Sequence, residues 1–171
     1  MLKVRDNKLE WTQIMRSNDI YLGLPYNLIQ FTSLQEIIAG WLKINVGSYC
    51  HYSDSLHLYH KDLNDIGISE DKGIRNEDSL LVDKDECFLN VNEIYSHMVE
   101  MSSGDISEQD LSRLSELDSN NTAYKNIMYI IALYVAEKKN YTLLSSELQK
   151  KCSNELYLSL WSEWRGRNNH G

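Results

Sequence analysis

The chain has 171 residues, a net charge of −8 and 42% hydrophobic residues, the composition of an ordinary globular protein. Its acidity argues against broad binding of nucleic acid, because such binding requires a basic surface that displaces counterions from phosphates. No stretch approaches the roughly 18 apolar residues of a membrane span, and the first residues lack the apolar core of a signal peptide. We therefore expect a cytoplasmic protein that binds neither nucleic acid nor membranes.

The cysteines indicate neither a disulfide framework nor a metal site. Cys50, Cys87 and Cys152 are far apart, odd in number and form no CxxC pair. We expect reduced thiols and no bound metal. A single arginine can still hold the phosphate of a small ligand, whatever the net charge of the chain.

The first 62 residues are rich in strand-forming residues. Alternation from Leu9 to Met15 predicts a strand that runs into Arg16-Ser17-Asn18-Asp19. Residues 23–25 interrupt the pattern, and a helix is predicted from about Asn27. Its apolar stripe comprises Leu28, Phe31, Leu34, Ile37, Ile38 and Trp41. Residues 49–59, where aromatic and polar residues interleave, are predicted to form another strand.

The rest of the chain changes character. Residues 63–82 are polar and acidic and are predicted to connect residues 1–62 to a helical region over residues 83–171. This region begins with an apolar stripe of Phe88, Val91, Ile94, Tyr95 and Met98. The further helices are expected at about 107–117, with Ser107 as N-cap, 121–139, 142–151 and 154–165, followed by a frayed tail over 166–171. The fold class is therefore α+β, a sheet-and-helix part followed by a helical part.

One long motif carries the functional signal. Arg16-Ser17-Asn18-Asp19-Ile20-Tyr21-Leu22-Gly23-Leu24-Pro25-Tyr26-Asn27 is followed by His57-Leu58-Tyr59, with His57 30 residues beyond Asn27. This resembles the thymidylate synthase family, whose nucleotide-binding signature reads R-S-x-D-x-x-L-G-L-P-[FY]-N, with H-x-Y at the same distance. The resemblance covers about residues 3–60 and implies a partial thymidylate-synthase-like fold.

The resemblance assigns nucleotide-binding roles to five residues. Arg16 and Ser17 match the pair that holds the 5′-phosphate, for which a guanidinium fork and a hydroxyl are well suited. Asn27 matches the residue that recognises the pyrimidine, and an amide there favours uracil over cytosine. His57 and Tyr59 match the pair that binds the sugar 3′-hydroxyl, and on a strand residues i and i+2 share a face.

Other interpretations of these residues remain open. Asn27 is also suited to cap a helix, and an Arg-Ser pair at a strand end is often only a solvated edge. The stripe Leu156, Leu160, Trp161 and Trp164 is either core of the helical part or a surface that covers another chain.

The resemblance also implies a folate cofactor, 5,10-methylenetetrahydrofolate. Asp19 matches the acid that contacts the folate, and Leu22 and Gly23 match the segment that lines the folate side. Ser53-Asp54-Ser55-Leu56 precedes His57 where the family usually has Gly-Asp-x, and this run looks more like the hydroxymethylases of the family. Both methyl and hydroxymethyl transfer to a dUMP-type nucleotide therefore stay open.

The family's catalytic cysteine has no counterpart in the motif region. In the family this nucleophile lies about twenty residues before the Arg-Ser pair, and its thiolate attacks the pyrimidine. Here 15 residues precede Arg16 and none is cysteine. We therefore expect the chain to be inactive alone, truncated before the nucleophile, and to act as a homodimer or with a complementary N-terminal part.

Three hypotheses follow from these observations. The chain is part of a pyrimidine-nucleotide C5-transferase, or a non-catalytic nucleotide-binding or assembly protein derived from that family, or a helical interaction module whose nucleotide site is vestigial. The intact motif residues favour the first two.

Overall fold

The computed structural model describes residues 1–64 and 72–168 and divides the chain into two compact units. The first unit comprises Met1–Asp71 with Leu80–Lys84, and the second comprises Lys72–Ser79 with Asp85–Gly171. The predicted α+β class is confirmed, with three strands and six α-helices among the described residues. Parts of the predicted connector and of the predicted tail lie outside the described residues.

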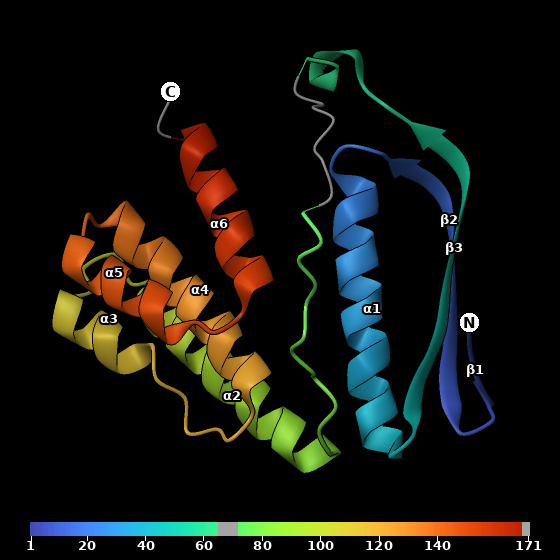
Figure 1. The fold of residues 1–171 in the computed structure, drawn as a ribbon, viewed down its shortest axis with the longest axis horizontal. Helices are drawn as coiled ribbons and strands as arrows, with labels where there is room; N and C mark the ends of the chain where they lie inside the picture. The colour runs from blue at the N-terminus through green and yellow to red at the C-terminus, as the bar shows by residue number, and fades with distance from the viewer. Residues whose placement is uncertain (65–71, 169–171) are drawn as a thin grey trace. The chain divides into compact units, whose positions relative to one another are not determined.

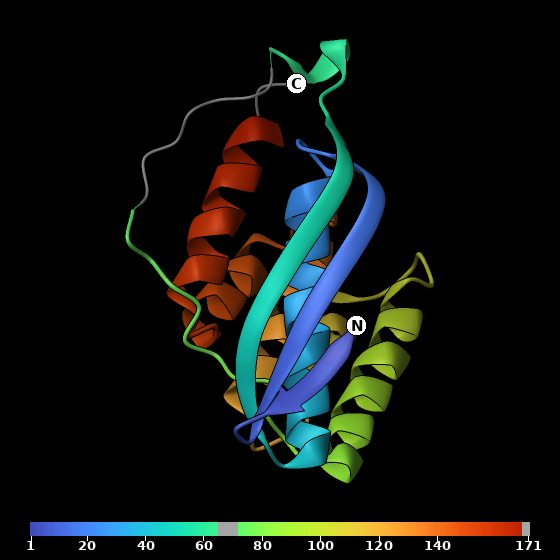
Figure 2. The same ribbon diagram turned by 90° about the vertical axis from the view of Figure 1, so that its right-hand side faces the viewer.

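The first unit is a hairpin followed by a βαβ unit (Figure 1). Its elements are β1 (Leu2–Arg5), β2 (Lys8–Asp19), α1 (Gly23–Leu42), β3 (Asn45–His57) and the 3₁₀ turn η1 (His60–Asp62). The strand order is β1-β2-β3, with β1 antiparallel and β3 parallel to β2. Figure 2 looks onto the sheet with α1 behind it, and Trp11 of β2 packs on Phe31 of α1 with ring centroids 5.6 Å apart.

The hairpin and the crossover helix follow from local chemistry. Asp6 and Asn7 join β1 to β2 with φ of 48° and 58°, the left-handed values that a two-residue hairpin turn requires. A parallel pair such as β2 and β3 needs a long crossover, which α1 provides. The first unit therefore presents the carboxyl ends of both long strands at one edge.

The predicted start of the helix is wrong by four residues. The helix α1 begins at Gly23, with Leu22 as its N-cap, so Asn27 lies in the second turn and does not cap the helix. Pro25 does not break the helix because N–H groups in a first turn have no intrahelical acceptor to lose. The second long strand also differs from its prediction, since β3 begins at Asn45 and ends at His57.

The side-chain amide of Gln35 joins α1 to both long strands. The pairing of β2 and β3 shifts between Leu9 and Trp11, where β3 carries one residue more than β2. Gln35 is 1% exposed, and its Nε2 donates to the carbonyl of Leu9 at 2.6 Å. The same Nε2 lies 3.3 Å and 3.2 Å from the carbonyl oxygens of Gly47 and Ser48. One helix residue thus satisfies carbonyls that the bulge takes out of the ladder.

Two glycines permit the close packing of this unit. A Cβ at Gly47 would lie 2.8 Å from the carbonyl oxygen of Leu9, so a side chain has no room in the bulge. A Cβ at Gly40 would lie 2.4 Å from the carbonyl oxygen of Val82. Val82 is buried, and its segment therefore completes the first unit by lying against the last turns of α1.

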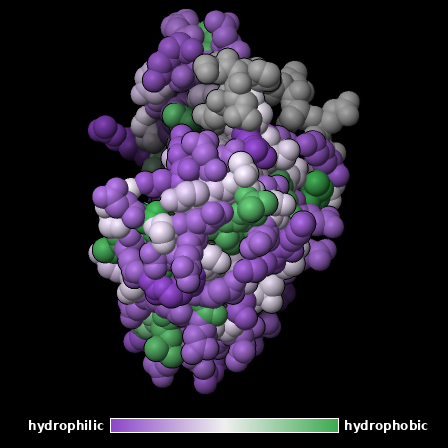
Figure 3. Space-filling view, turned by 90° about the vertical axis from the view of Figure 1, so that its left-hand side faces the viewer, coloured by the Kyte–Doolittle hydropathy of each residue, from purple (hydrophilic) through white to green (hydrophobic). Residues whose placement is uncertain are grey.

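The second unit consists of helices. They are α2 (Lys84–Met101), α3 (Glu108–Leu114), α4 (Thr122–Lys138), α5 (Thr142–Lys151) and α6 (Glu155–Asn168). The predicted N-cap Ser107 is confirmed, because its hydroxyl accepts from the backbone N–H of Asp110 at 3.1 Å. Fully buried side chains include Leu111, Leu114, Met128, Leu133 and Leu148. The face in Figure 3 is largely hydrophilic, with apolar side chains in small separate groups.

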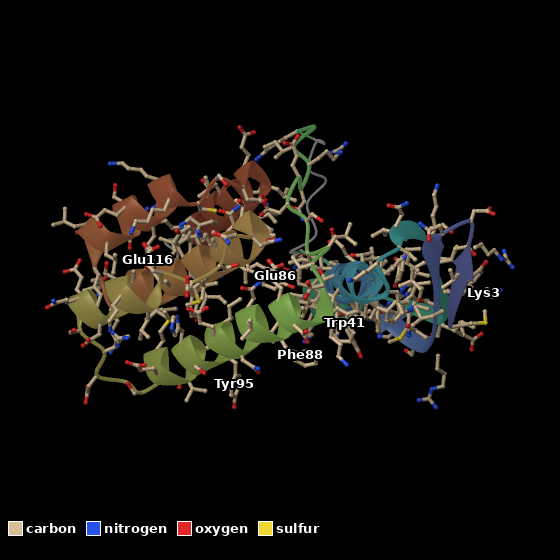
Figure 4. The ribbon with its side chains drawn as sticks, turned by 90° about the horizontal axis from the view of Figure 1, so that it is seen from below. Lys3, Trp41, Glu86, Phe88, Tyr95 and Glu116 are labelled. Carbon is tan, nitrogen blue, oxygen red and sulfur yellow. The ribbon has the colours of Figure 1, made fainter. Side chains whose placement is uncertain are left out.

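The predicted stripe on α2 lies mostly on the exposed side of the helix. Phe88 and Tyr95, labelled in Figure 4, are 46% and 67% exposed, whereas Cys87 and Asn90 are buried. The spacing of the apolar residues therefore predicted the helix correctly, but these residues do not form its buried face. On α6, Trp161 is buried and stacks on Trp164 at 4.8 Å.

Asp78 fastens the segment before Leu80 to the second unit. Its carboxylate accepts from the side-chain amides of Asn126 at 3.0 and 3.2 Å and of Asn154 at 2.7 Å. Asn126 and Asn154 are buried, and Asn154 also caps α6 by accepting from the backbone N–H of Tyr157 at 3.0 Å. Both oxygens of the Asp78 carboxylate thus have amide donors.

Replacing Gln35 with leucine is expected to destabilise the first unit. The change leaves buried carbonyls of both strands without their donor, which lowers the free energy of unfolding by about 1–3 kcal/mol. Hydrogen exchange of the β2 and β3 amides measures this unit separately from the helical one. The control is Gln30→Leu, a change of the same kind at an exposed position of α1. Equal protection in both variants would contradict the assigned role of Gln35.

Candidate functional site

Three of the predicted nucleotide-binding residues meet where β2 and β3 end. Asp19 and His57 are partners in the parallel register, and the backbone N–H of Ile20 donates to the carbonyl of His57 at 2.9 Å. The hydroxyl of Ser17 lies 3.3 Å from Nδ1 of His57. The rings of His57 and Tyr59 meet edge to face at 4.9 Å. Ser17, His57 and Tyr59 therefore form one cluster.

The cluster does not arise in the manner predicted for His57 and Tyr59. The strand ends at His57, and Tyr59 precedes η1, so the two residues do not share the face of one strand. Their rings meet because the chain turns directly after the strand. Arg16 is exposed beside Ser17 and makes no side-chain hydrogen bond or ion pair within the described ranges.

Asp19 shapes the loop between β2 and α1. Its carboxylate accepts from the backbone N–H of Tyr21 at 3.0 Å and of Leu22 at 3.2 Å. The hydrogen bond from Tyr21 contributes most to a pKa below the ordinary value of this carboxyl, and those from Leu22 and Gly23 add to it against a partial loss of hydration. The three residues predicted for the folate side, Asp19, Leu22 and Gly23, are thus neighbours in one turn.

Asn27 is held by residues that the motif did not indicate. Its Nδ2 donates to Oδ1 of Asn18 at 3.1 Å. Nδ2 of Asn18 lies 3.0 Å from Nε2 of His51, whose Nδ1 is 2.8 Å from the hydroxyl of Tyr49. Asn18 occupies a variable position of the signature and is 3% exposed. The only sequence signal for the other two is their alternation on one strand, two residues apart.

Gly23 makes room for this arrangement. A Cβ at Gly23 would lie 2.6 Å from Oδ1 of Asn18. The glycine of the signature therefore has a packing role beside the one that the resemblance gives it, because any larger residue would displace the amide that holds Asn27.

No cysteine of this chain lies among these residues. Cys87 and Cys152 are buried in the helical unit, where loss of hydration raises the pKa of the Cys152 thiol. Cys50 is exposed between Tyr49 and His51, so alternation directs it to the opposite face of β3. The described residues contain no group of three or more acidic, histidine or cysteine side chains placed to hold a metal. None of the described helices could span a bilayer.

The first unit thus gathers polar side chains at the carboxyl ends of two parallel strands joined by a helix, which is the edge where open α/β sheets generally bind ligands. Comparison with known proteins identifies the family. The sequence model of thymidylate synthase matches residues 1–100, more than half of the chain, which therefore belongs to the thymidylate synthase family.

The matches to curated relatives each cover little more than a third of the chain. Deoxyuridylate hydroxymethyltransferase of Bacillus phage SP01 is 44% identical over 61 residues, 35% of this chain and 16% of that protein. Thymidylate synthases of Symbiobacterium thermophilum and Listeria monocytogenes are 32% and 33% identical over 63 residues, 37% of this chain and 22% and 20% of theirs. The chain thus spans about a fifth of the length of the curated relatives it matches.

The lowered pKa of Asp19 predicts a pH-dependent loop. Because the folded-state pKa lies below the unfolded one, the carboxylate stabilises the fold above the unfolded pKa, and this contribution is lost as the pH falls through the folded pKa. A carbon-13 NMR titration of Asp19 in the native chain should give a lower midpoint than the same titration in urea. A native midpoint at or above the urea value would contradict the hydrogen bonding described for this carboxylate.

Proposed function

We propose that the first unit binds the nucleotide in a folate-dependent transfer of a one-carbon group to C5 of a dUMP-type pyrimidine. The observation that carries the proposal is the cluster of Ser17, His57 and Tyr59 across two strands, with Asn27 on the helix that joins them. Membership of the family supports the same conclusion.

Each residue has a distinct task in this proposal. Arg16 holds the 5′-phosphate with a charge-assisted fork, and the hydroxyl of Ser17 adds a further donor. His57 and Tyr59 bind the 3′-hydroxyl of the sugar. Asn27 reads the pyrimidine, because an amide offers both a donor and an acceptor to neighbouring atoms of the ring.

The cofactor in this proposal is 5,10-methylenetetrahydrofolate, and it supplies the one-carbon group when bound. Asp19 is suited to accept from N–H groups of its pterin, with Leu22 and Gly23 lining that side. Identity is higher with the phage hydroxymethyltransferase, at 44%, than with the synthases, at 32% and 33%, which favours hydroxymethyl transfer.

The nucleophile in this proposal comes from polypeptide outside this sequence. Such polypeptide is either a complementary N-terminal part or a second copy of a longer protein. The sheet offers a surface for it: Ile14 and Tyr52 are paired in register and are 69% and 62% exposed. A second polypeptide that covers this pair would remove its apolar surface from water.

A second candidate is a non-catalytic nucleotide-binding protein, favoured by the placement of all three cysteines away from the cluster. An in-frame Pro-Cys codon pair in the DNA upstream of Met1 would favour the transferase. Its absence would favour the binding protein.

Replacing Arg16 with alanine is expected to weaken binding of dUMP and to leave binding of deoxyuridine unchanged, because deoxyuridine lacks the phosphate. Loss of charge-assisted hydrogen bonds should raise the Kd for dUMP about 10- to 100-fold, measured by calorimetry. Arg5→Ala is the matched control, since Arg5 lies in β1 and pairs with Glu10 at 3.5 Å. The unmodified chain binding no dUMP would refute the proposed function, and equal losses for both ligands would refute the role of Arg16.

A further inference from the structure

Four side chains form a continuous line of hydrogen bonds that ends at the pyrimidine-reading residue. The line runs from the hydroxyl of Tyr49 to the ring of His51, to the amide of Asn18 and then to the amide of Asn27, with separations of 2.8, 3.0 and 3.1 Å. It joins β3, β2 and α1 within the first unit. Only the last member carries a role assigned from the family motif.

The amide orientations of Asn18 and Asn27 set the direction of every bond in this line. Nδ2 of Asn18 can only donate, so Nε2 of His51 must accept and carries no proton. The neutral ring then holds its proton on Nδ1 and donates it to the oxygen of Tyr49. A phenol with its ordinary pKa is already a neutral hydroxyl near neutral pH, and burial raises the pKa of Tyr49 further. Oδ1 of Asn18 is left to accept from Asn27.

We infer that Tyr49, His51 and Asn18 are positioning residues that fix the amide orientation of Asn27 and thereby select uracil over cytosine. This inference rests on the proposed function, in which Asn27 reads the ring. With Nδ2 anchored on Asn18, Asn27 presents its Oδ1 and its second N–H to the ligand. Uracil offers an N–H at N3 and a carbonyl at C4, which match that pair.

Cytosine offers the opposite pattern, an acceptor at N3 and an amino group at C4. Asn27 could match it only by turning its amide through half a turn, which would place its Oδ1 against Oδ1 of Asn18. Two facing acceptors repel, and relief would require Asn18 to turn and the proton of His51 to move to Nε2. The line therefore opposes the reversal at three successive groups.

The surroundings restrict such a reversal further. Asn18 is 3% exposed, so solvent cannot easily replace a broken hydrogen bond. Gly23 lies close enough that its missing Cβ would approach Oδ1 of Asn18 to 2.6 Å. Burial and the close approach of Gly23 thus leave the amide of Asn18 little room to turn.

The first test is independent of any ligand. Nitrogen-15 NMR of the free 171-residue chain should show His51 protonated at Nδ1 and unprotonated at Nε2 near neutral pH. A ring protonated at Nε2 would overturn the inference, because Asn18 would then have to accept from His51 and present its Nδ2 to Asn27.

The second test compares affinities for dUMP and dCMP by calorimetry. Asn18→Leu removes the anchor and should reduce the preference for dUMP about tenfold or more. Asn18→Asp keeps an acceptor for Asn27 and should retain most of the preference. Asn45→Leu, at an exposed position of the same sheet, is the control and should leave the ratio unchanged. A purely structural role for Asn18 would weaken both ligands equally.

The outcomes separate this inference from the proposed function. An unmodified chain that binds neither nucleotide overturns both. Binding of dUMP with the same preference in Asn18→Leu overturns the inference alone. If Asn18→Leu does not fold, Tyr49→Phe is the deciding variant. The inference requires that part of the His51 rings in this variant carry their proton on Nε2 and that the preference for dUMP over dCMP becomes smaller. No change in either quantity would refute the inference.

Discussion

The buried amide of Gln35 is the interaction on which the first unit depends. A parallel pair of strands with an inserted residue leaves carbonyls outside the ladder, and a helix packed on such a pair normally offers only apolar side chains to it. Gln35 resolves the conflict by donating from the helix to the carbonyl of Leu9, beside those of Gly47 and Ser48. The contact fixes where α1 lies along the strands.

The geometry at the carboxyl ends of β2 and β3 depends on that contact. Once α1 is set against β2 and β3, its second turn brings Asn27 to Asn18, while the parallel register brings Ser17 to His57. None of these contacts requires a strained backbone at the site itself. In the proposal, the residues that bind the nucleotide are therefore placed by packing elsewhere in the first unit, such as that of Gln35, which lies eight residues after Asn27.

The sequence predicted the helices and strands better than it predicted which side chains are buried between them. Periodicity located the helices and long strands, because regular spacing of apolar residues reflects secondary structure directly. It misplaced the start of α1, since Gly23 and Pro25 suggest a break although a first helical turn accepts both.

The burial of polar side chains in the interior could not be predicted from the sequence. Gln35 and Asn18 are nearly fully buried, yet nothing in their neighbourhood distinguishes them from solvated amides. The motif pointed to Asn27 and His57 as candidates because family resemblance does not depend on burial. It gave no indication of His51, whose role appears only when strands and helix are brought together.

The attachment of Asp78 to the helical unit has a consequence for dissecting the chain. Residues 72–79 belong to the second unit. Residues 80–84 belong to the first unit, where Val82 lies against Gly40 of α1. The polypeptide therefore passes between the units three times, and no single cut yields either of them whole. A fragment ending at residue 62 would lack the segment that covers the last turns of α1, so a fragment that contains the whole first unit must extend to residue 84.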